Sequence, residues 1–178
     1  MRKIISYSPL ILMIIMCVLL TSRLLDEERN LDKYIFDDTI TGNPLPNFAI
    51  DSFSGEGLSS EKIRQKEGYK LVVFFASWCV PCLAEHKTLM EIAKKKELTI
   101  YGINWKDKAS DVYRWFRRAG NPYKAIGIDK TAKTSVLFGV TGVPESFLVD
   151  RRGYVIYRHN GPLDMKRYID EIKPLMED

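Results

Sequence analysis

Residues 71–82 read Leu-Val-Val-Phe-Phe-Ala-Ser-Trp-Cys-Val-Pro-Cys, an apolar run followed by two closely spaced cysteines. The run is typical of a buried strand, and residues 83–96 have the pattern of a helix. A thiol in the first turn of a helix faces unpaired backbone N–H groups, which favour thiolate over thiol. We therefore expect Cys79 to be a nucleophile and Cys82, one turn further on, to be the resolving thiol that closes a disulfide with it. Pro81 suits the first helical turn, where a missing N–H costs little.

Two other interpretations of the cysteine pair stay open at this level. A Cys-Xaa-Xaa-Cys pair is half of a zinc site, which His86 and His159 could complete, but such motifs usually lie in a hairpin knuckle rather than between a strand and a helix. The pair could also be an inert structural disulfide, although so short a loop gives little stabilisation by closing. The context favours redox chemistry without a metal. We expect both histidines to be structural or surface residues, because thiol exchange needs a thiolate rather than an imidazole.

An apolar segment near the amino terminus predicts a transmembrane anchor at residues 1–24. No charged residue occurs between Ile4 and Ser22, and Arg2 and Lys3 precede this span. Its length is just sufficient to cross a bilayer. A cleaved signal peptide has a similar pattern, but no small-x-small cleavage site follows, so an uncleaved anchor is favoured. Basic residues flank the span on both sides, so their count does not choose a topology.

The rest of the chain divides into a tether and one domain. Residues 25–42 are mostly charged and polar, and residues 43–178 suit a single α/β domain. The net charge of +4 is modest and the charges are interspersed, which argues against a nucleic-acid-binding surface. Cys17 lies inside the apolar span, where we expect it to pack or to face lipid. Only Cys79 and Cys82 lie outside the span, so no further disulfide indicates an oxidising compartment.

The order of expected elements beyond the cysteine motif defines the fold class. We expect a strand at 98–103, a helix at 110–119 with Ser110 as its N-cap, a short apolar piece at 125–128, a helical turn at 131–138, strands at 145–150 and 154–158, and a helix at 164–176. The first strand, helix and second strand require a right-handed crossover between parallel strands. This order predicts a thioredoxin fold, an α/β domain in which helices flank a central mixed sheet.

Further motifs accompany the cysteine pair along the soluble part of the chain. They are WCVPCLAEH (78–86), GINWKD (102–107), GNPY (120–123), GVTGVPESF (139–147) and YRHNGPL (157–163). On these motifs the chain resembles the CcmG/DsbE family, the membrane-anchored periplasmic thiol:disulfide interchange proteins of cytochrome c maturation. A lone WCxxC motif indicates only the fold, whereas the other motifs in this order are far more specific. The resemblance implies a single-pass anchor in the inner membrane with the soluble domain on the periplasmic side.

The resemblance also assigns residues to a substrate groove around Cys79. Thioredoxin-like folds carry a cis-proline before the strand that faces the cysteines, so the Val143-Pro144 peptide is expected to be cis. The backbone of Val143 would then be open to pairing with a substrate strand. An ordinary trans turn proline is the alternative. Trp78 and Pro81 are expected to contribute to the same groove, with a buried core position as the alternative for the tryptophan.

Proton handling is expected to differ from that of ordinary thioredoxins. Those proteins carry a buried acid six positions before the first cysteine, where this chain has Val73. Glu85 and Glu145 match acids of the CcmG/DsbE pattern, and a carboxylate near a thiolate raises the pKa of the thiol. Glu145 is the stronger candidate, whereas Glu85 is equally consistent with a solvated helix position. Residues 104–107 either help to shape the groove or form a plain loop.

The function implied by the resemblance is reduction of a disulfide outside the cytoplasm. The implied client is the disulfide of an apocytochrome c haem-attachment CxxCH motif, or that of an assembly partner. A membrane thiol transporter would resupply the electrons. No cofactor is expected besides the redox-active Cys79–Cys82 disulfide. The alternatives are a tethered reductase with another client, as in oxidase assembly or sporulation, and a redox-inert binding module on the same fold.

Overall fold

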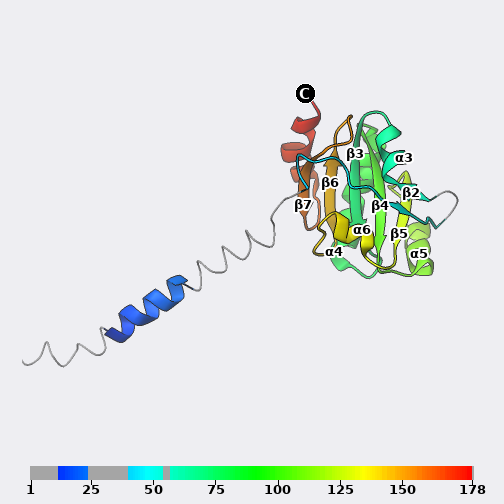
Figure 1. Ribbon diagram of the computed structural model, residues 1–178. Coiled ribbons are helices and arrows are strands. Elements are labelled where there is room, and N and C mark those ends of the chain that lie inside the picture. Colours follow the sequence, from blue (N-terminus) through cyan, green and yellow to red (C-terminus); the bar gives the residue numbers. More distant parts are fainter. Residues whose placement is uncertain (1–11, 24–39, 54–56, 178) are drawn as a thin grey trace, which may run out of the picture. The chain divides into compact units, whose positions relative to one another are not determined.

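The computed structural model describes residues 12–23, 40–53 and 57–177 (Figure 1). Residues 12–23 are helical, and the described residues from 40 onward belong to a second, compact unit. Within the described parts of the chain, no helix combines the length and the apolar character needed to cross a membrane. Half of the predicted anchor (1–24) and most of the predicted tether (25–42) lie outside these parts, so both stay predictions.

A five-stranded mixed sheet forms the centre of the domain and confirms the predicted thioredoxin fold (Figure 1). Its strand order is β5-β4-β3-β6-β7. Strands β3, β4 and β5 are parallel, whereas β6 runs antiparallel to β3 and β7 antiparallel to β6. The strands are β3 (Tyr69–Phe75), β4 (Leu98–Trp105), β5 (Ala125–Asp129), β6 (Glu145–Val149) and β7 (Val155–Asn160).

Each face of the sheet packs against its own apolar core. Along β3, Leu71, Val73 and Phe75 belong to one core, and Val72 and Phe74 belong to the other. The first core is completed by α4 (Val80–Lys95), α5 (Ala109–Ala119) and the C-terminal helical segment, and the second by α3 (Ser60–Gln65) and by Phe138 after α6 (Lys133–Leu137). Because side chains alternate between the faces of a strand, neighbouring residues here serve opposite sides of the domain.

The helix that carries the cysteines, α4, begins at Val80, before the helical sequence pattern of residues 83–96, and Pro81 lies in its first turn as predicted. Cys79 is its N-cap, and its sulfur accepts a hydrogen bond from the backbone N–H of Cys82 at 3.1 Å. Pro81 lies in the first turn, where the absent N–H would have had no helical partner. The apolar periodicity of the sequence starts after this turn, so the periodicity alone indicates the interior of the helix but not its N-terminal end.

The C-terminal segment is helical, as predicted, but it is not one α-helix. Asp164 caps a short α-helix, α7 (Met165–Arg167), by accepting a hydrogen bond from the N–H of Arg167. The chain continues as a π-helix (Tyr168–Ile172) and then a 3₁₀ helix (Lys173–Met176). Pro174 lies in the last of these, where it cannot donate a backbone hydrogen bond.

Other elements differ from the prediction in smaller ways. The short strands β1 (Ala49–Ile50) and β2 (Leu58–Ser59) pair with each other and were not predicted, because so short a hairpin has no clear periodicity. Helix α5 has Lys108 rather than Ser110 in the N-cap position, and no side chain caps it.

Residues 40–45 form an edge segment of the globular unit. The N–H of Gly42 donates to the carbonyl of Val155 at 2.8 Å, and the N–H of Leu45 donates to the carbonyl of Gly153 at 2.9 Å. Ile40 and Leu45 are both buried. The segment therefore covers the beginning of β7, which is an edge strand of the main sheet.

Candidate active site

Cys79 and Cys82 form a disulfide at the N-terminal end of α4, with their Cα atoms 5.3 Å apart. Cys79 is 4% exposed and Cys82 is 1% exposed, so both sulfurs are shielded in the oxidised protein. The backbone N–H of Cys82 points at the sulfur of Cys79. This N–H and the helix dipole both favour negative charge on Cys79 when the disulfide opens. The geometry thus supports Cys79 as the nucleophile and Cys82 as the resolving thiol.

The peptide bond between Val143 and Pro144 is cis, as predicted. It lies immediately before β6, and the carbonyl oxygen of Val143 is 3.4 Å from the sulfur of Cys79. The side chain of Val143 packs against both cores, and the residue is partly exposed. The structure therefore brings the expected groove backbone directly beside the nucleophilic sulfur.

Exposed apolar side chains surround the disulfide. Trp78 is 56% exposed, Val80 is 74% exposed and Leu83 is 44% exposed, so the tryptophan is not a core aromatic. The indole N–H of Trp78 donates to the carbonyl of Lys106 at 3.2 Å, which holds the ring beside the disulfide. Apolar surface at such a position is typical of a site that docks another polypeptide.

Glu85 is the buried acid on the dithiol side of the sheet. It lies three residues after Cys82 on α4, hence on the same helix face, and it is 2% exposed. One of its oxygens accepts a hydrogen bond from the N–H of Leu163 at 2.9 Å, and the other has no hydrogen-bond partner. Burial raises the pKa of Glu85 to about 8, against the weaker effect of the Leu163 N–H. The position occupied by an acid in ordinary thioredoxins is the fully buried Val73.

The position of Glu145 corrects the expectation that this residue surrounds the dithiol with negative charge. Glu145 follows Pro144, but it pairs with Phe74 in the sheet and shares a strand face with Phe147, on the core opposite the disulfide. Its carboxylate forms an ion pair with Arg158 at 2.5 Å, and both side chains are buried. Burial raises the pKa of Glu145, and the guanidinium opposes that shift. The carboxyl groups of Glu145 and Glu85 thus lie on opposite sides of the sheet, with Glu85 on the side of the disulfide.

The two histidines are both held in structural contacts. The ring of His86 stacks on Phe116 and lies 4.7 Å from the ring of Trp115, with Nε2 3.3 Å from the carbonyl oxygen of Ala119. His159 is buried against Arg167 of the C-terminal segment. In the part of the chain that the structure describes, no group of His, Cys, Asp and Glu is placed to hold a metal ion.

Ser77, near the disulfide, was not predicted as a site residue, and its partner Asp107 belongs to residues 104–107, which were expected either to shape the groove or to form a plain loop. Ser77 and Asp107 are joined by two hydrogen bonds, from the serine N–H at 2.5 Å and from its hydroxyl at 2.9 Å. Asp107 belongs to the GINWKD motif, which was the only sequence signal available for it. The contact links the loop before Cys79 to the loop after β4.

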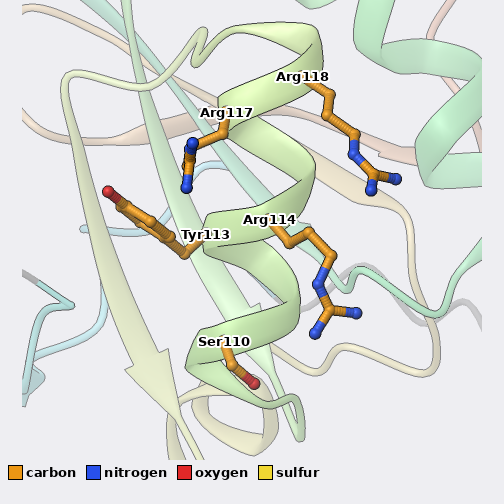
Figure 2. A pocket seen from close by; sticks show the side chains of 5 residues that line it. All are labelled: Ser110, Tyr113, Arg114, Arg117 and Arg118. Carbon is orange, nitrogen blue, oxygen red and sulfur yellow. The ribbon is translucent and has the colours of Figure 1, made fainter.

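A hollow of about 370 Å³ lies on the outer surface of α5 and contains none of the predicted site residues. Figure 2 shows Tyr113 and Arg117 on one side of this helix and Arg114 and Arg118 on the other. Arg117 lies over the ring of Tyr113 at 5.9 Å, and Arg114 is 3.6 Å from the carboxylate of Asp111. The disulfide and its cis-proline thus remain the candidate active site.

A disulfide at the cap of a helix, with the carbonyl of the residue before a cis-proline against one sulfur, is an arrangement for exchanging disulfides with another polypeptide. It places the chain in the class of thioredoxin-fold thiol-disulfide oxidoreductases. Residues 40–172 match the Redoxin family model. A thiol:disulfide interchange protein DsbE from Pasteurella multocida is 32% identical over 171 residues, which cover 96% of this chain and 94% of that protein. The chain belongs to the DsbE family.

Two further proteins are similar to this chain. The thiol:disulfide interchange protein CycY from Rhizobium leguminosarum is 44% identical over 107 residues, which cover 60% of this chain and 58% of CycY. The crystal structure of a thioredoxin-family thiol:disulfide interchange protein from Chlorobium tepidum superposes with a TM-score of 0.64 at 26% identity, covering 80% of this chain and 99% of the other. Family membership confirms the expected enzyme class, a thiol-disulfide oxidoreductase.

Proposed function

We propose that this chain is a membrane-anchored reductant of cytochrome c maturation, acting on the disulfide of apocytochrome c haem-attachment motifs or on that of an assembly partner. The observation that carries the proposal is the Cys79–Cys82 disulfide at the end of α4 beside the Val143 carbonyl. The client follows from the resemblance to the CcmG/DsbE family over the motifs of the soluble domain. The exposed apolar side chains around the disulfide support a polypeptide client.

The reaction starts from the reduced dithiol and moves two electrons to the client. The thiolate of Cys79 attacks one client sulfur, a mixed disulfide forms, and the other client sulfur leaves as a thiolate. Cys82 then loses its proton and attacks the sulfur of Cys79. This step closes the Cys79–Cys82 disulfide and releases the second client thiolate. The client ends with two thiols after protonation, and the enzyme must be reduced again by a membrane thiol transporter.

The asymmetry between the two cysteines follows from their places on the helix. Cys79 is the N-cap residue, with the Cys82 N–H directed at its sulfur and the Val143 backbone beside it. Cys82 lies inside the first turn, where it belongs to the core beneath α4. Client attack is therefore assigned to Cys79, and Cys82 acts only on the mixed disulfide.

Glu85 is proposed as the group that exchanges the proton of Cys82. A carboxyl with a pKa of about 8 is mostly protonated near neutral pH but keeps an ionised fraction, which suits it to accept or return a proton there. Its position one turn after Cys82 places it on the side of α4 that contains the resolving thiol. Its oxygen without a hydrogen-bond partner is free to take the proton.

The proposed location is the inner membrane, with the domain on the periplasmic side. The uncharged span from Ile4 to Ser22 supports a single-pass anchor. The family resemblance supports the orientation, since basic residues flank both ends of the span. Anchoring would keep the domain near a membrane thiol transporter.

A trapping experiment tests both the cysteine roles and the client. Cys82→Ser leaves the nucleophile but removes the resolving thiol, so it should accumulate reductant-sensitive adducts in cells that make c-type cytochromes. Cys79→Ser should accumulate none. Both variants are made in a Cys17→Ser background, because Cys17 is an unpaired thiol that could form unrelated adducts.

The outcomes separate the two parts of the proposal. Adducts that contain an apocytochrome or a cytochrome-assembly protein support the assigned client. Adducts without any such component would show that the client is different. Equal trapping by the two cysteine variants would contradict the assigned order of attack.

A further inference from the structure

Both oxygens of the Asp107 carboxylate accept hydrogen bonds from Ser77, in the loop that leads into the active site. One oxygen accepts hydrogen bonds from the N–H of Ser77 at 2.5 Å and from the amide of Asn104 at 3.0 Å. The other accepts from the hydroxyl of Ser77 at 2.9 Å and from the N–H of Lys108 at 2.6 Å. Two of the four donors come from Ser77, two residues before the nucleophilic Cys79.

Trp78, which lies between Ser77 and Cys79, is held by the loop that follows β4. The indole N–H of Trp78 donates to the carbonyl of Lys106, and the Trp78 ring lies 6.1 Å from the ring of Trp105. Lys106 has a positive φ of 45°, a backbone conformation that a non-glycine residue rarely adopts. The turn before Cys79 is thus attached through both of its residues to one short segment, Trp105–Asp107.

Asn104 connects this segment to the central sheet. This residue is fully buried at the end of β4 and pairs in register with Phe75 at the end of β3. Its amide lies 3.4 Å from the carbonyl oxygen of Phe75, to which it donates, and it also donates to Asp107. The position of the Asp107 carboxylate is therefore fixed relative to the strands on which the active site is built.

We propose that Asp107 is a positioning residue that sets the distance between the two sides of the substrate groove. Trp78 and Cys79 form one side, and the Val143 carbonyl forms the other, 3.4 Å from the sulfur. A polypeptide client must pair with Val143 and present its sulfur to Cys79 at the same time, so it depends on this distance. A small disulfide contacts only the sulfur of Cys79, so its reaction does not depend on the distance between the two sides of the groove. The inference rests on the proposed docking of a client at Val143.

The test compares two kinds of disulfide with the same reduced full-length protein in detergent. One is a synthetic peptide with an intramolecular Cys-Xaa-Xaa-Cys-His disulfide, and the other is hydroxyethyl disulfide. Asp107→Ala should lower the second-order rate constant of the single-turnover reaction with the peptide about tenfold or more, while the rate constant with hydroxyethyl disulfide changes by less than about threefold. Ser77→Ala, which removes only the hydroxyl contact, should show a smaller loss in the same direction. If the alanine variant does not fold, Asp107→Asn, which keeps the size of the side chain, takes its place in the same comparison.

Asp111→Asn is the matched control, because Asp111 lies on the adjacent turn and contacts Arg114 rather than Ser77. It should leave both rates unchanged. If the Asp107 variants lose rate equally with both disulfides, the effect belongs to the thiolate or to the fold, and the positioning role is overturned. An unchanged rate with the peptide would overturn it as well. A second peptide that lacks the histidine distinguishes the positioning role of Asp107 from the proposed cytochrome client. If both peptides react at the same rate, the result argues against the cytochrome client, but the dependence of the rate on Asp107 remains.

Discussion

Glu85→Gln should remove the loss of stability that this carboxyl causes in the oxidised protein as the pH rises. The buried carboxyl accepts the Leu163 N–H through one oxygen and leaves the other without a partner. A glutamine has the same shape, can accept the same hydrogen bond and resembles the protonated acid. The substitution therefore removes ionisation while it leaves the packing of α4 intact.

The size of the effect follows from the difference in pKa between the folded and unfolded states. A carboxyl whose pKa is raised by folding binds its proton more tightly in the folded protein, so its stabilisation is complete below the unfolded pKa and is lost as the pH rises through the folded pKa. With a folded pKa of about 8 and an ordinary value of 4.5, the free energy of unfolding should fall by roughly 3.5 kcal/mol between pH 5 and pH 8.

Urea unfolding of the oxidised protein between pH 5 and pH 8 measures this change. The natural protein and Glu85→Gln should have similar stability at pH 5, and the variant should be more stable by roughly 3 kcal/mol at pH 8. Glu91→Gln is the matched control on an exposed face of α4 and should behave like the natural protein. Equal pH dependence in the natural protein and Glu85→Gln would refute the assignment of a raised pKa to this carboxyl.

Two further substitutions test other parts of the structure. Glu145→Gln leaves the buried Arg158 without its counter-ion and should cost about 3 kcal/mol of stability. Because Glu145 lies across the sheet from the disulfide, absorbance titration of the reduced protein should show an unchanged pKa for Cys79, and a large shift would contradict this placement. Gly102→Ala would put a Cβ atom 2.7 Å from the Phe75 ring, so thermal unfolding should reveal a loss of about 1–3 kcal/mol. Unchanged stability would show that the ring can move aside.

The parts of the fold predicted from the sequence were those with strong local signals. The apolar run before the cysteines identified β3, because a strand buried on both faces is almost continuously apolar. The turn at Arg151–Gly153 marked the hairpin between β6 and β7, and Gly153 adopts a positive φ of 88° there. The C-terminal π-helix was not predictable, because the same apolar spacing suits an α-helix.

In the candidate site, the sequence located some residues correctly but could not place the two acids. The cysteine pair and the cis-proline have motifs of their own and were located correctly. The sheet faces on which Glu85 and Glu145 lie could not be predicted, because they depend on the sheet register. Only the pairing of Glu145 with Phe74 shows which face that side chain occupies. The burial of Glu85 likewise depends on Leu163, which is far away in the sequence.

The reduction potential of the Cys79–Cys82 disulfide tests the central claim most directly, because a reductant must hold its disulfide in a stable oxidised form. The disulfide is buried, and Glu85, on the same helix face as Cys82, provides no positive charge to stabilise a thiolate there, so both features favour the oxidised state. Equilibration of the protein with defined glutathione buffers, followed by alkylation and mass spectrometry, measures the potential. The proposed function predicts a value well below about −120 mV, the potential of a strong periplasmic oxidant. A value close to about −120 mV would contradict the assignment as a reductant.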